Sequence, residues 1–201
     1  MRTDITTEGD PRPAIVQEFA AWTAIAALRS GRHMKSSTKL RRRLFRVDFK
    51  KVLECGPITQ EEFDLWHQRS CLFLRDSGVR PVGWAAKLLN VYLKTLVYVG
   101  GFGHQTLAEC IHPAIDNLLI GAVRDECKRG AVAIGPNLAG WTRIKDMRRY
   151  EDYKSLIDEL RALTPGLKCR TGFELERFWH IQRIPEKRIR DRTMPEDCWG
   201  R

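Results

Sequence analysis

The chain has 201 residues, of which 43% are hydrophobic and 30% charged, and its formal net charge is +10. A chain of this length can bury one well-filled hydrophobic core. Its longest apolar stretch, residues 19–28, is about half of the ~20 residues that a bilayer crossing needs, so the sequence excludes a transmembrane protein. The polar first residues contain no apolar leader segment, and the cysteines form no CxxC pair. We therefore expect a cytoplasmic protein with reduced thiols.

The first predicted element is a helix that follows a flexible N-terminus, residues 1–12. Ile15, Phe19 and Trp22 recur at intervals of three and four residues, which is the spacing of one face of a helix. Ser30-Gly31 ends this pattern. We expect the helix to pack this apolar face into the core.

Two segments concentrate the positive charge of the chain. Residues 35–51 hold eight Lys or Arg and one Asp, and residues 177–192 hold six Lys or Arg and two acidic residues. Cations that neutralise phosphates release condensed counterions, so these clusters favour nucleic acid as the partner. The predicted nucleic-acid-binding residues are Lys35, Lys39, Arg41, Arg42, Arg43, Arg46, Lys50, Lys51, Lys187, Arg188, Arg190 and Arg192.

The two basic clusters are also compatible with roles that do not involve nucleic acid. A single cluster can be a solvated helix face, and the two together can bind an acidic protein. A membrane surface is not expected, because neither cluster carries a long apolar opposite face. Within residues 35–51, Leu40 and Leu44 keep helical spacing, whereas Phe45, Val47 and Phe49 alternate with a period of two. We expect a helix here with a strand-like exit.

The clearest local signal is a helix start at Thr59. The Thr59 side chain can cap the helix, and Glu62, three residues later, can close a capping box. This pattern predicts a helix that runs to about residue 74. The next predicted helix, residues 84–99, is apolar on most of its surface, so we expect it to be the buried central helix of the protein.

Helices are also predicted in the second half of the chain. Asp116 precedes a helical pattern that begins at residue 117 and is placed to act as its N-cap. Further helices are expected at 150–163 and 173–181. These patterns predict a mainly α protein with a single-domain helical bundle, residues 13–182, followed by a basic tail, residues 183–201.

Two residues of this helical region carry candidate chemistry. Lys87 lies on the polar side of the predicted central helix with Asn90 and Lys94. A lysine that loses water in a pocket becomes an amine nucleophile, and the alternative is a lysine whose stem packs on the protein while its charge reaches solvent. Asp116 is either an electrostatic partner for developing positive charge or a plain helix cap.

The order of these residues resembles a known family. Two segments carry the resemblance: Gly83 followed by Trp84-Ala85-Ala86-Lys87, and later Pro113-Ala114-Ile115-Asp116. Their order is similar to that in the catalytic half of the helix-hairpin-helix DNA glycosylase superfamily, with the 8-oxoguanine glycosylase branch as the suggested relative. The resemblance covers residues 78–128. It implies that Lys87 attacks the sugar C1′ as an amine, that Asp116 stabilises the oxocarbenium-like sugar, and that the target base leaves the stack. It also implies that the partner is DNA in preference to RNA and that the setting is repair or phage defence.

The sequence leaves two further alternatives. The first is a non-catalytic nucleic-acid-binding or complex-forming helical subunit in which Lys87 and Asp116 are structural. The second is a weak zinc hypothesis, with the candidate ligands His67, Cys71, Cys110 and His112. No nucleotide-binding or hydrolase motif is found, and we expect neither a cofactor nor a bound metal.

Overall fold

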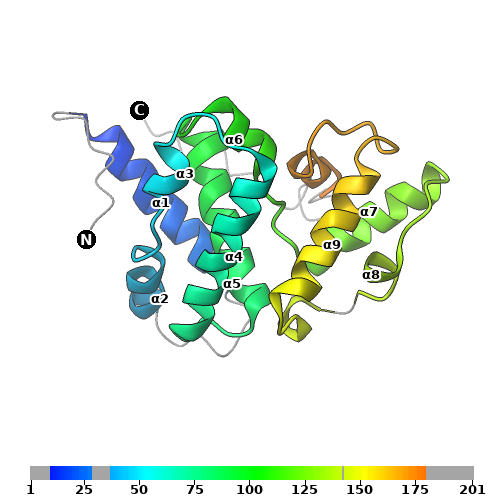
Figure 1. Cartoon of the computed structure of the whole chain (residues 1–201), viewed down its shortest axis with the longest axis horizontal. Helices are drawn as coiled ribbons and strands as arrows, with labels where there is room; N and C mark the ends of the chain where they lie inside the picture. The colour runs from blue at the N-terminus through cyan, green and yellow to red at the C-terminus, as the bar shows by residue number, and fades with distance from the viewer. Residues whose placement is uncertain (1–9, 29–36, 142, 180–201) are drawn as a thin grey trace, which may run out of the picture.

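The computed structural model describes residues 10–28, 37–141 and 143–179, which are mainly helical and contain no strand. Figure 1 shows two neighbouring groups of helices. The first group contains α1 (Arg12–Ala26), α2 (Ser37–Leu44), α3 (Lys50–Leu53), α4 (Gln60–Asp76), α5 (Val82–Lys94), a π-helix (Thr95–Val99) and α6 (Gln105–Cys110). The second group contains α7 (Asn117–Arg129), α8 (Pro136–Ala139), a 3-10 helix (Ile144–Asp146), α9 (Tyr150–Leu163) and a second 3-10 helix (Phe173–Phe178).

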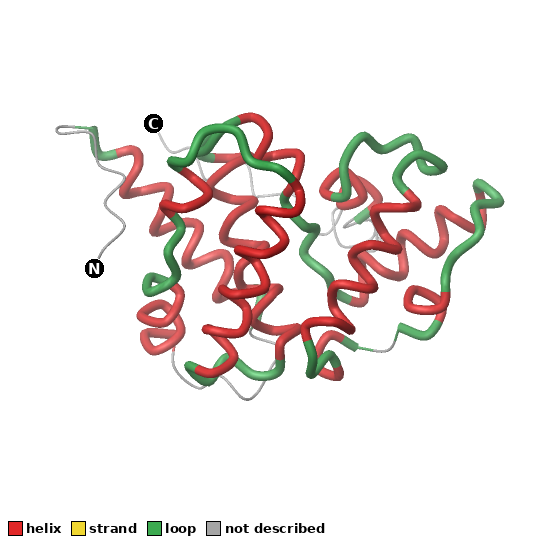
Figure 2. Tube along the Cα trace, in the orientation of Figure 1, coloured by secondary structure: helices red, strands yellow, loops and turns green. Residues whose placement is uncertain are grey.

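The two groups form one domain. A single cluster of buried apolar side chains extends from Ala20 to Leu175 and includes residues of both groups. The loop 111–116 crosses from α6 to α7, as the tube in Figure 2 shows, and residues 111–115 are buried. The predicted mainly α, single-domain fold is confirmed.

The start of α4 follows the predicted capping box. The Thr59 hydroxyl accepts a hydrogen bond from the Glu62 backbone N–H at 3.2 Å, and the Glu62 carboxylate accepts one from the Thr59 backbone N–H at 2.8 Å. Two of the backbone N–H groups that a helix start leaves without partners are satisfied in this way. The helix therefore begins at Gln60 and continues to Asp76, two residues beyond the predicted end.

Helix α5 is the central helix of the first group, as its composition predicted. It contacts α1, α4 and α9, and most of its residues are buried. Its last part continues as the π-helix Thr95–Val99, so the regular α-helix ends earlier than the predicted residue 99. This position gives α5 contacts with both helix groups.

The prediction for the face of α1 is wrong. Ile15, Phe19 and Trp22 are 62%, 50% and 59% exposed, while the buried residues of α1 are alanines, Ala20, Ala21 and Ala24. Helix α1 packs against α5 with this small-residue face. Small side chains at a contact shorten the distance between two helix axes, so the alanine face fits α5 more closely than the bulky face would.

The first basic segment forms a helix, but its expected strand-like exit is a turn. Helix α2 buries Leu40 and Leu44 as their spacing predicted. Val47 and Phe49 are also buried, in the non-extended connection to α3, and the Phe49 ring lies 4.6 Å from the ring of Tyr92. Their period of two therefore reflects a turn that places both side chains in the core.

Two short helices, α6 and α8, lie outside the segments for which a helix was predicted. Helix α1 begins at Arg12. Most of the predicted N-terminal segment, residues 1–9, and the predicted basic tail, residues 183–201, lie outside the described residues. Among the described helices, none combines the length and the apolar character that crossing a membrane requires.

Candidate functional site

Lys87 and Asp116 lie together where α5 meets the start of α7. The Lys87 Nζ is 3.1 Å from the Asp116 Oδ2, and their side chains are 11% and 19% exposed. The other carboxylate oxygen, Oδ1, accepts the backbone N–H groups of Leu118 and Leu119 at 3.0 and 2.9 Å. The structure thus brings the two predicted catalytic residues together, and Asp116 is the N-cap of α7 as its position predicted.

The polar side of α5 holds the second helix group. Lys87, Asn90 and Lys94 are spaced three and four residues apart and therefore share one face of the helix. The Asn90 Nδ2 donates to the Pro113 carbonyl at 3.0 Å, and the Lys94 Nζ lies 2.6 Å from the Glu176 Oε2. The other oxygen of Glu176 accepts a backbone N–H of the loop 111–116. All three polar side chains of α5 therefore bind this loop or a residue that binds it.

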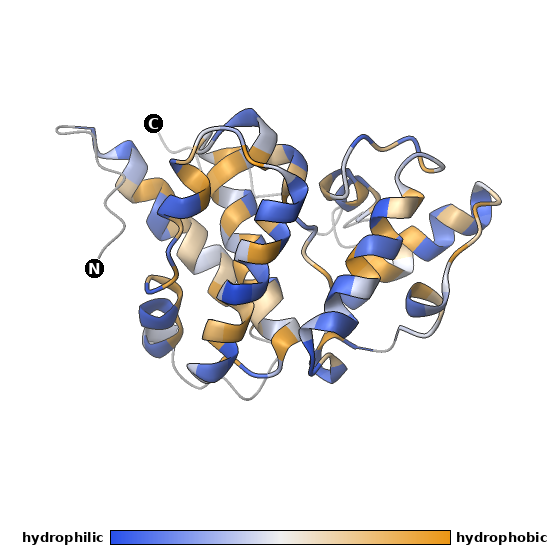
Figure 3. Ribbon diagram, viewed as in Figure 1, coloured by the Kyte–Doolittle hydropathy of each residue, from blue (hydrophilic) through white to orange (hydrophobic). Residues whose placement is uncertain are grey.

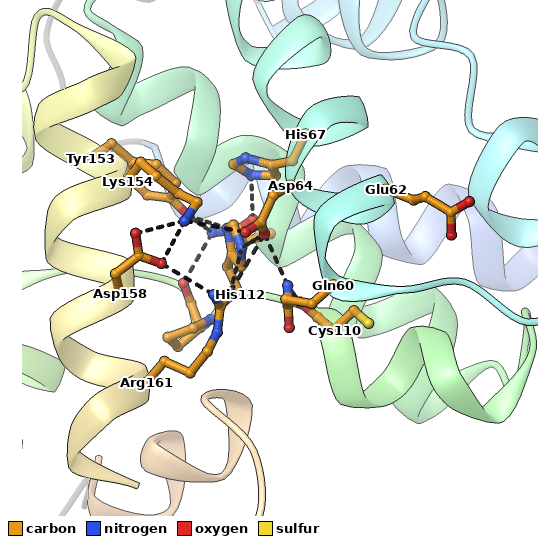
Figure 4. Close-up of polar contacts among 12 residues, drawn as sticks. Gln60, Glu62, Asp64, His67, Cys110, His112, Tyr153, Lys154, Asp158 and Arg161 are labelled. Atoms are coloured by element: carbon orange, nitrogen blue, oxygen red, sulfur yellow. Dashed lines mark hydrogen bonds and ion pairs between the residues drawn. The ribbon is translucent and has the colours of Figure 1, made fainter.

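A second set of polar side chains lies between α4, α5 and α9 (Figure 4). We call the following residues the interior polar network: Asp64, His67, Asn90, His112, Tyr150 and Tyr153. Asp64 lies at its edge. The Asp64 Oδ1 accepts hydrogen bonds from the Gln60 Nε2 at 2.9 Å and from the His112 Nε2 at 2.8 Å. Lys154 and Arg161 of α9 approach its carboxylate to 3.3 and 3.5 Å.

Asn90 is the centre of the interior polar network. Its Nδ2 donates to the Tyr153 hydroxyl at 2.8 Å as well as to the Pro113 carbonyl, so its Oδ1 is the acceptor for the His67 Nε2 at 2.9 Å. The other ring nitrogen of His67 then accepts the hydroxyl hydrogen of Tyr150 at 2.9 Å. A neutral His67 satisfies this arrangement completely.

The same reasoning makes His112 neutral. Its Nε2 donates to Asp64, and its Nδ1 lies 3.0 Å from the Tyr153 hydroxyl. That hydroxyl accepts from Asn90 and has its own hydrogen to donate, so a neutral His112 that accepts it satisfies both groups. Each buried polar group of the chain from Asn90 to Asp64 has a partner. Fully paired polar groups avoid the desolvation cost that an unpaired buried group carries.

Burial and pairing set the pKa values of this network. Burial lowers the pKa of His67 and of His112 below the usual histidine range, and the hydrogen bond to Asp64 only partly opposes this for His112. Burial by itself would raise the pKa of Asp64. The hydrogen bonds from His112 and Gln60 and the positive charge of Arg161 outweigh burial and hold the pKa of Asp64 well below its usual value.

The candidate zinc ligands do not form a metal site. His67 and Cys71 share a helix face, with the Sγ 3.6 Å from the His67 Nδ1, but the hydrogen bonds described above occupy the ring nitrogens of both histidines. Burial raises the pKa of Cys71 well above its usual value and that of Cys110 to about 11, which disfavours the thiolate that binds zinc. No group of three or more His, Cys, Asp or Glu in the described part of the chain is arranged to hold a metal ion.

The interior polar network is closed to a substrate. The hollow beside it, between His112 and Arg161, measures only about 10 Å³, which is the space of one water molecule. Asp64 and His67 come from α4, Asn90 from α5, and Tyr150 and Tyr153 from α9. The network therefore joins the two helix groups and has no room for catalysis on a bound molecule.

The described part of the first basic cluster lies on and just after α2. We call the following residues the basic face: Lys39, Arg41, Arg42, Arg43, Arg46, Lys50 and Lys51. Helix α2 is hydrophilic over most of its surface, as Figure 3 shows, and five of the seven cations are exposed, with Arg41 and Arg43 partly buried. Lys35, Lys187, Arg188, Arg190 and Arg192 lie outside the described residues.

Most cations of the basic face have no acidic partner in the part of the chain that the structure describes. Arg41 forms an ion pair with Glu18, and Lys51 lies 3.7 Å from Asp48. In contrast, no described carboxylate forms an ion pair with Arg42, Arg43, Arg46 or Lys50. Their charge is therefore not neutralised by the described residues of the protein and is available to an anionic partner.

Sequence reasoning missed Asp64, Asn90 and Tyr153 as members of a polar network. The available signal was Asn90, an amide in the middle of a predicted buried helix, because a buried amide requires hydrogen-bond partners. Comparison of the chain with protein-family models, with curated proteins and with solved structures finds no match.

Proposed function

We propose that the protein binds nucleic acid through the basic face and cleaves an N-glycosidic bond with Lys87 and Asp116. The observation that carries this proposal is the distance of 3.1 Å between the Lys87 Nζ and the Asp116 Oδ2, two residues that are far apart in the sequence. An amine and a carboxylate at this distance can exchange a proton. Both side chains keep a small exposed fraction, so the pair is not sealed in the core.

The chemistry follows from these two groups. The Asp116 carboxylate accepts a proton from the Lys87 ammonium, and the resulting amine attacks the sugar C1′. The bond from Nζ to C1′ forms while the bond from C1′ to the base breaks, and the electron pair and a proton leave with the base. Asp116 passes the proton that it took from Lys87 to the departing base, and its restored negative charge stabilises the positive charge that develops on the sugar. Opening of the sugar ring then gives a Schiff base between Lys87 and C1′.

The binding part of the proposal rests on the unpaired cations of the basic face. Phosphate groups would take the place of the carboxylates that Arg42, Arg43, Arg46 and Lys50 lack. Such contacts do not depend on base sequence, and the logarithm of the affinity falls by about 0.9 per phosphate contact for each tenfold increase in salt. A steep salt dependence is therefore the signature of this surface.

The second candidate function is a non-catalytic nucleic-acid-binding helical subunit. It is favoured by the helix-capping role of Asp116, whose Oδ1 already accepts two backbone N–H groups, and by the contact of the whole polar side of α5 with the loop 111–116. The chain also lacks the Leu-Pro-Gly-x-Gly hairpin that holds DNA phosphate in the superfamily it resembles. In this case Lys87 and Asp116 would only hold the two helix groups together.

Borohydride trapping separates the two candidates. The full chain is incubated with a panel of single-stranded and duplex DNAs that contain damaged bases or abasic sites, and sodium borohydride then reduces any Schiff base to a stable cross-link. We expect a cross-link with the natural chain and none with Lys87→Gln. The matched control is Lys94→Gln, because Lys94 lies on the same helix, is about as buried as Lys87 and also pairs with a carboxylate.

Three results would overturn the catalytic proposal. They are the absence of a cross-link and of base release on every substrate, an undiminished cross-link in Lys87→Gln, and an equal loss in Lys94→Gln. If the base is released without a cross-link, and Asp116→Asn abolishes this release, the protein is a glycosylase that uses Asp116 and has no lyase step. An affinity that does not change with salt would overturn the phosphate-binding part.

A further inference from the structure

A pocket of about 580 Å³ lies between α4 and the segment that leads from α2 through α3. Binding sites for small molecules measure about 300–1,000 Å³, so the pocket has the size of a ligand site. It is lined by neither Lys87 nor Asp116. The chemistry described so far therefore gives it no role.

The interior of the pocket is apolar and partly aromatic. Trp66 and Phe73 of α4 line it together with smaller apolar side chains such as Val47 and Val52. The indole N–H of Trp66 is bound to the Asp48 carbonyl at 3.0 Å, which fixes the ring. A fixed aromatic ring offers a surface for stacking to a flat ligand.

One polar group on this wall, the Ser70 hydroxyl, has no hydrogen-bond partner among the described residues. Ser70 is buried, and its hydroxyl forms no hydrogen bond with the described residues. A hydroxyl can both donate and accept a hydrogen bond, so the Ser70 side chain can bind a polar group of a molecule in the pocket. Ser70 is therefore suited to the polar edge of a ligand that is otherwise flat and apolar.

The rim of the pocket is positive. Arg46 and Arg69 line it and form no ion pair with a described carboxylate. The two acidic residues at the pocket are already engaged, since Asp48 lies 3.7 Å from the Lys51 Nζ and Glu62 accepts the backbone N–H of the capping box. A planar guanidinium binds phosphate oxygens in pairs, so the rim selects a phosphate group.

From this combination we infer that the pocket binds a nucleotide, with the base between Trp66 and Phe73 and the phosphate on Arg46 and Arg69. Arg46 also belongs to the basic face, so the pocket is continuous with the surface that binds nucleic acid in the proposed function. The nucleotide can be free in solution or can be one unit of a bound strand. The inference rests on the proposed function only in the second case.

Cys55 provides a direct probe of the site. It lines the pocket and is exposed, whereas the other described cysteines are buried. The variant Cys198→Ser removes the one cysteine outside the described residues. The rate at which iodoacetamide alkylates Cys55 in this background then reports on the occupancy of the pocket.

We expect saturating nucleoside monophosphate to slow the alkylation of Cys55 at least about tenfold, whereas the matching nucleoside and inorganic phosphate protect poorly. Arg69→Gln should weaken the protection about tenfold or more, because it removes a charged hydrogen-bond donor. The matched control is Arg148→Gln, which removes an exposed cation outside the pocket and should leave protection unchanged. Protection by a short oligonucleotide alone would assign the site to a nucleotide within a strand.

Four results would overturn the inference. The first is equal protection of Cys55 by decanoate, an apolar anion without a base, and the second is no protection by either mononucleotides or oligonucleotides. The third is strong protection by inorganic phosphate alone. The fourth is an equal loss of protection in Arg69→Gln and Arg148→Gln. Failure of this site is distinguishable from failure of the proposed function. If DNA binding depends on salt and Lys87 forms a cross-link, but Cys55 is not protected, only the nucleotide site is refuted. If mononucleotides protect Cys55 but the protein does not bind DNA, only the proposed function is refuted.

Discussion

The interior polar network and the basic face use their polar side chains in opposite ways. In the network, each ring nitrogen of His67 and His112 and each amide atom of Asn90 has a partner inside the protein. On the basic face, four of the seven cations have no acidic partner among the described residues. The comparison shows that polar groups with complete internal pairing stabilise this fold, whereas the groups without it are the candidates for binding.

The Lys87–Asp116 pair lies between these two cases. Its two side chains bind one another, and Asp116 also caps α7, as expected of structural residues. The pair keeps a small exposed fraction, however, and the interior polar network does not include it. The contacts alone therefore do not distinguish a structural role from a catalytic one, and the cross-linking experiment described above decides between them.

The largest effect on stability is expected from Asn90→Leu, which removes the amide at the centre of the interior polar network. Leucine has a similar size but leaves His67, Tyr153 and the Pro113 carbonyl without their partner. Each unsatisfied buried group costs about 1–3 kcal/mol, so we expect a loss of about 3 kcal/mol or more in the free energy of unfolding, measured in urea. The exposed Asn117→Leu is the control, and an equal loss in both variants would contradict a special role of the network.

A smaller effect is expected from acid. Because the pKa values of His67 and His112 are lower in the folded protein than the usual value of about 6.5, the unfolded chain binds protons first, and stability falls as the pH decreases below that value. Asp64 has a lowered pKa in the folded protein, so its contribution is present above about pH 4 and is lost at lower pH. Urea unfolding at a series of pH values measures both ranges.

Asp64→Asn tests whether Asp64 causes the loss of stability at low pH. We expect the variant to be less stable than the natural protein at pH 7, because it loses the charge that pairs with Lys154 and Arg161. Below about pH 4, its stability should fall less steeply, since the group that takes up a proton on unfolding has been removed. An unchanged slope in this range would show that Asp64 does not control acid unfolding.

The smallest effect on stability is expected on the basic face. A variant in which Arg42, Arg43, Arg46 and Lys50 are changed to Gln should alter the free energy of unfolding by less than about 1 kcal/mol. No described carboxylate pairs with these side chains, and the contact of the Arg46 guanidinium with the Phe73 ring, 5.8 Å from the ring centroid, contributes about 0.5–1 kcal/mol at most. Its DNA affinity should fall, and the slope of the affinity against salt should become shallower, by up to ~0.9 for each phosphate contact that is lost. The control variant removes four exposed cations elsewhere, at Lys128, Lys145, Arg148 and Lys168.

Equal losses of affinity in the two charge variants would show that only the net charge matters. A basic-face variant that unfolds easily would show instead that its cations stabilise the fold. Either result would contradict the distinction between the two regions.

The sequence predicts the elements whose signals are local. The capping box at Thr59, the N-cap at Asp116 and the limits of α9 follow from residues within one or two turns of each helix. The exposed face of α1 could not be predicted in this way, because which face is buried depends on the helix that packs against it. The alanines fit α5, and Phe19 and Trp22 remain outside.

The candidate site was predictable only in part. Lys87 and Asp116 were selected by type and order in the chain, and the fold places them in contact. The interior polar network joins residues as far apart as Asp64 and Tyr150. Such contacts exist only after two helix groups have packed, so a single sequence contains no local signal for their geometry.

The polar side of α5 also determines where the chain can change its length. Successive residues of an α-helix are rotated by about 100°, so one extra residue between Lys87 and Asn90 would turn Lys87 away from the face that carries Asn90 and Lys94. The links of α5 to Asp116, Pro113 and Glu176 could then no longer form together. The connection between α7 and α8 contains none of the residues in these links, so a change of length there would leave the three links of α5 in register.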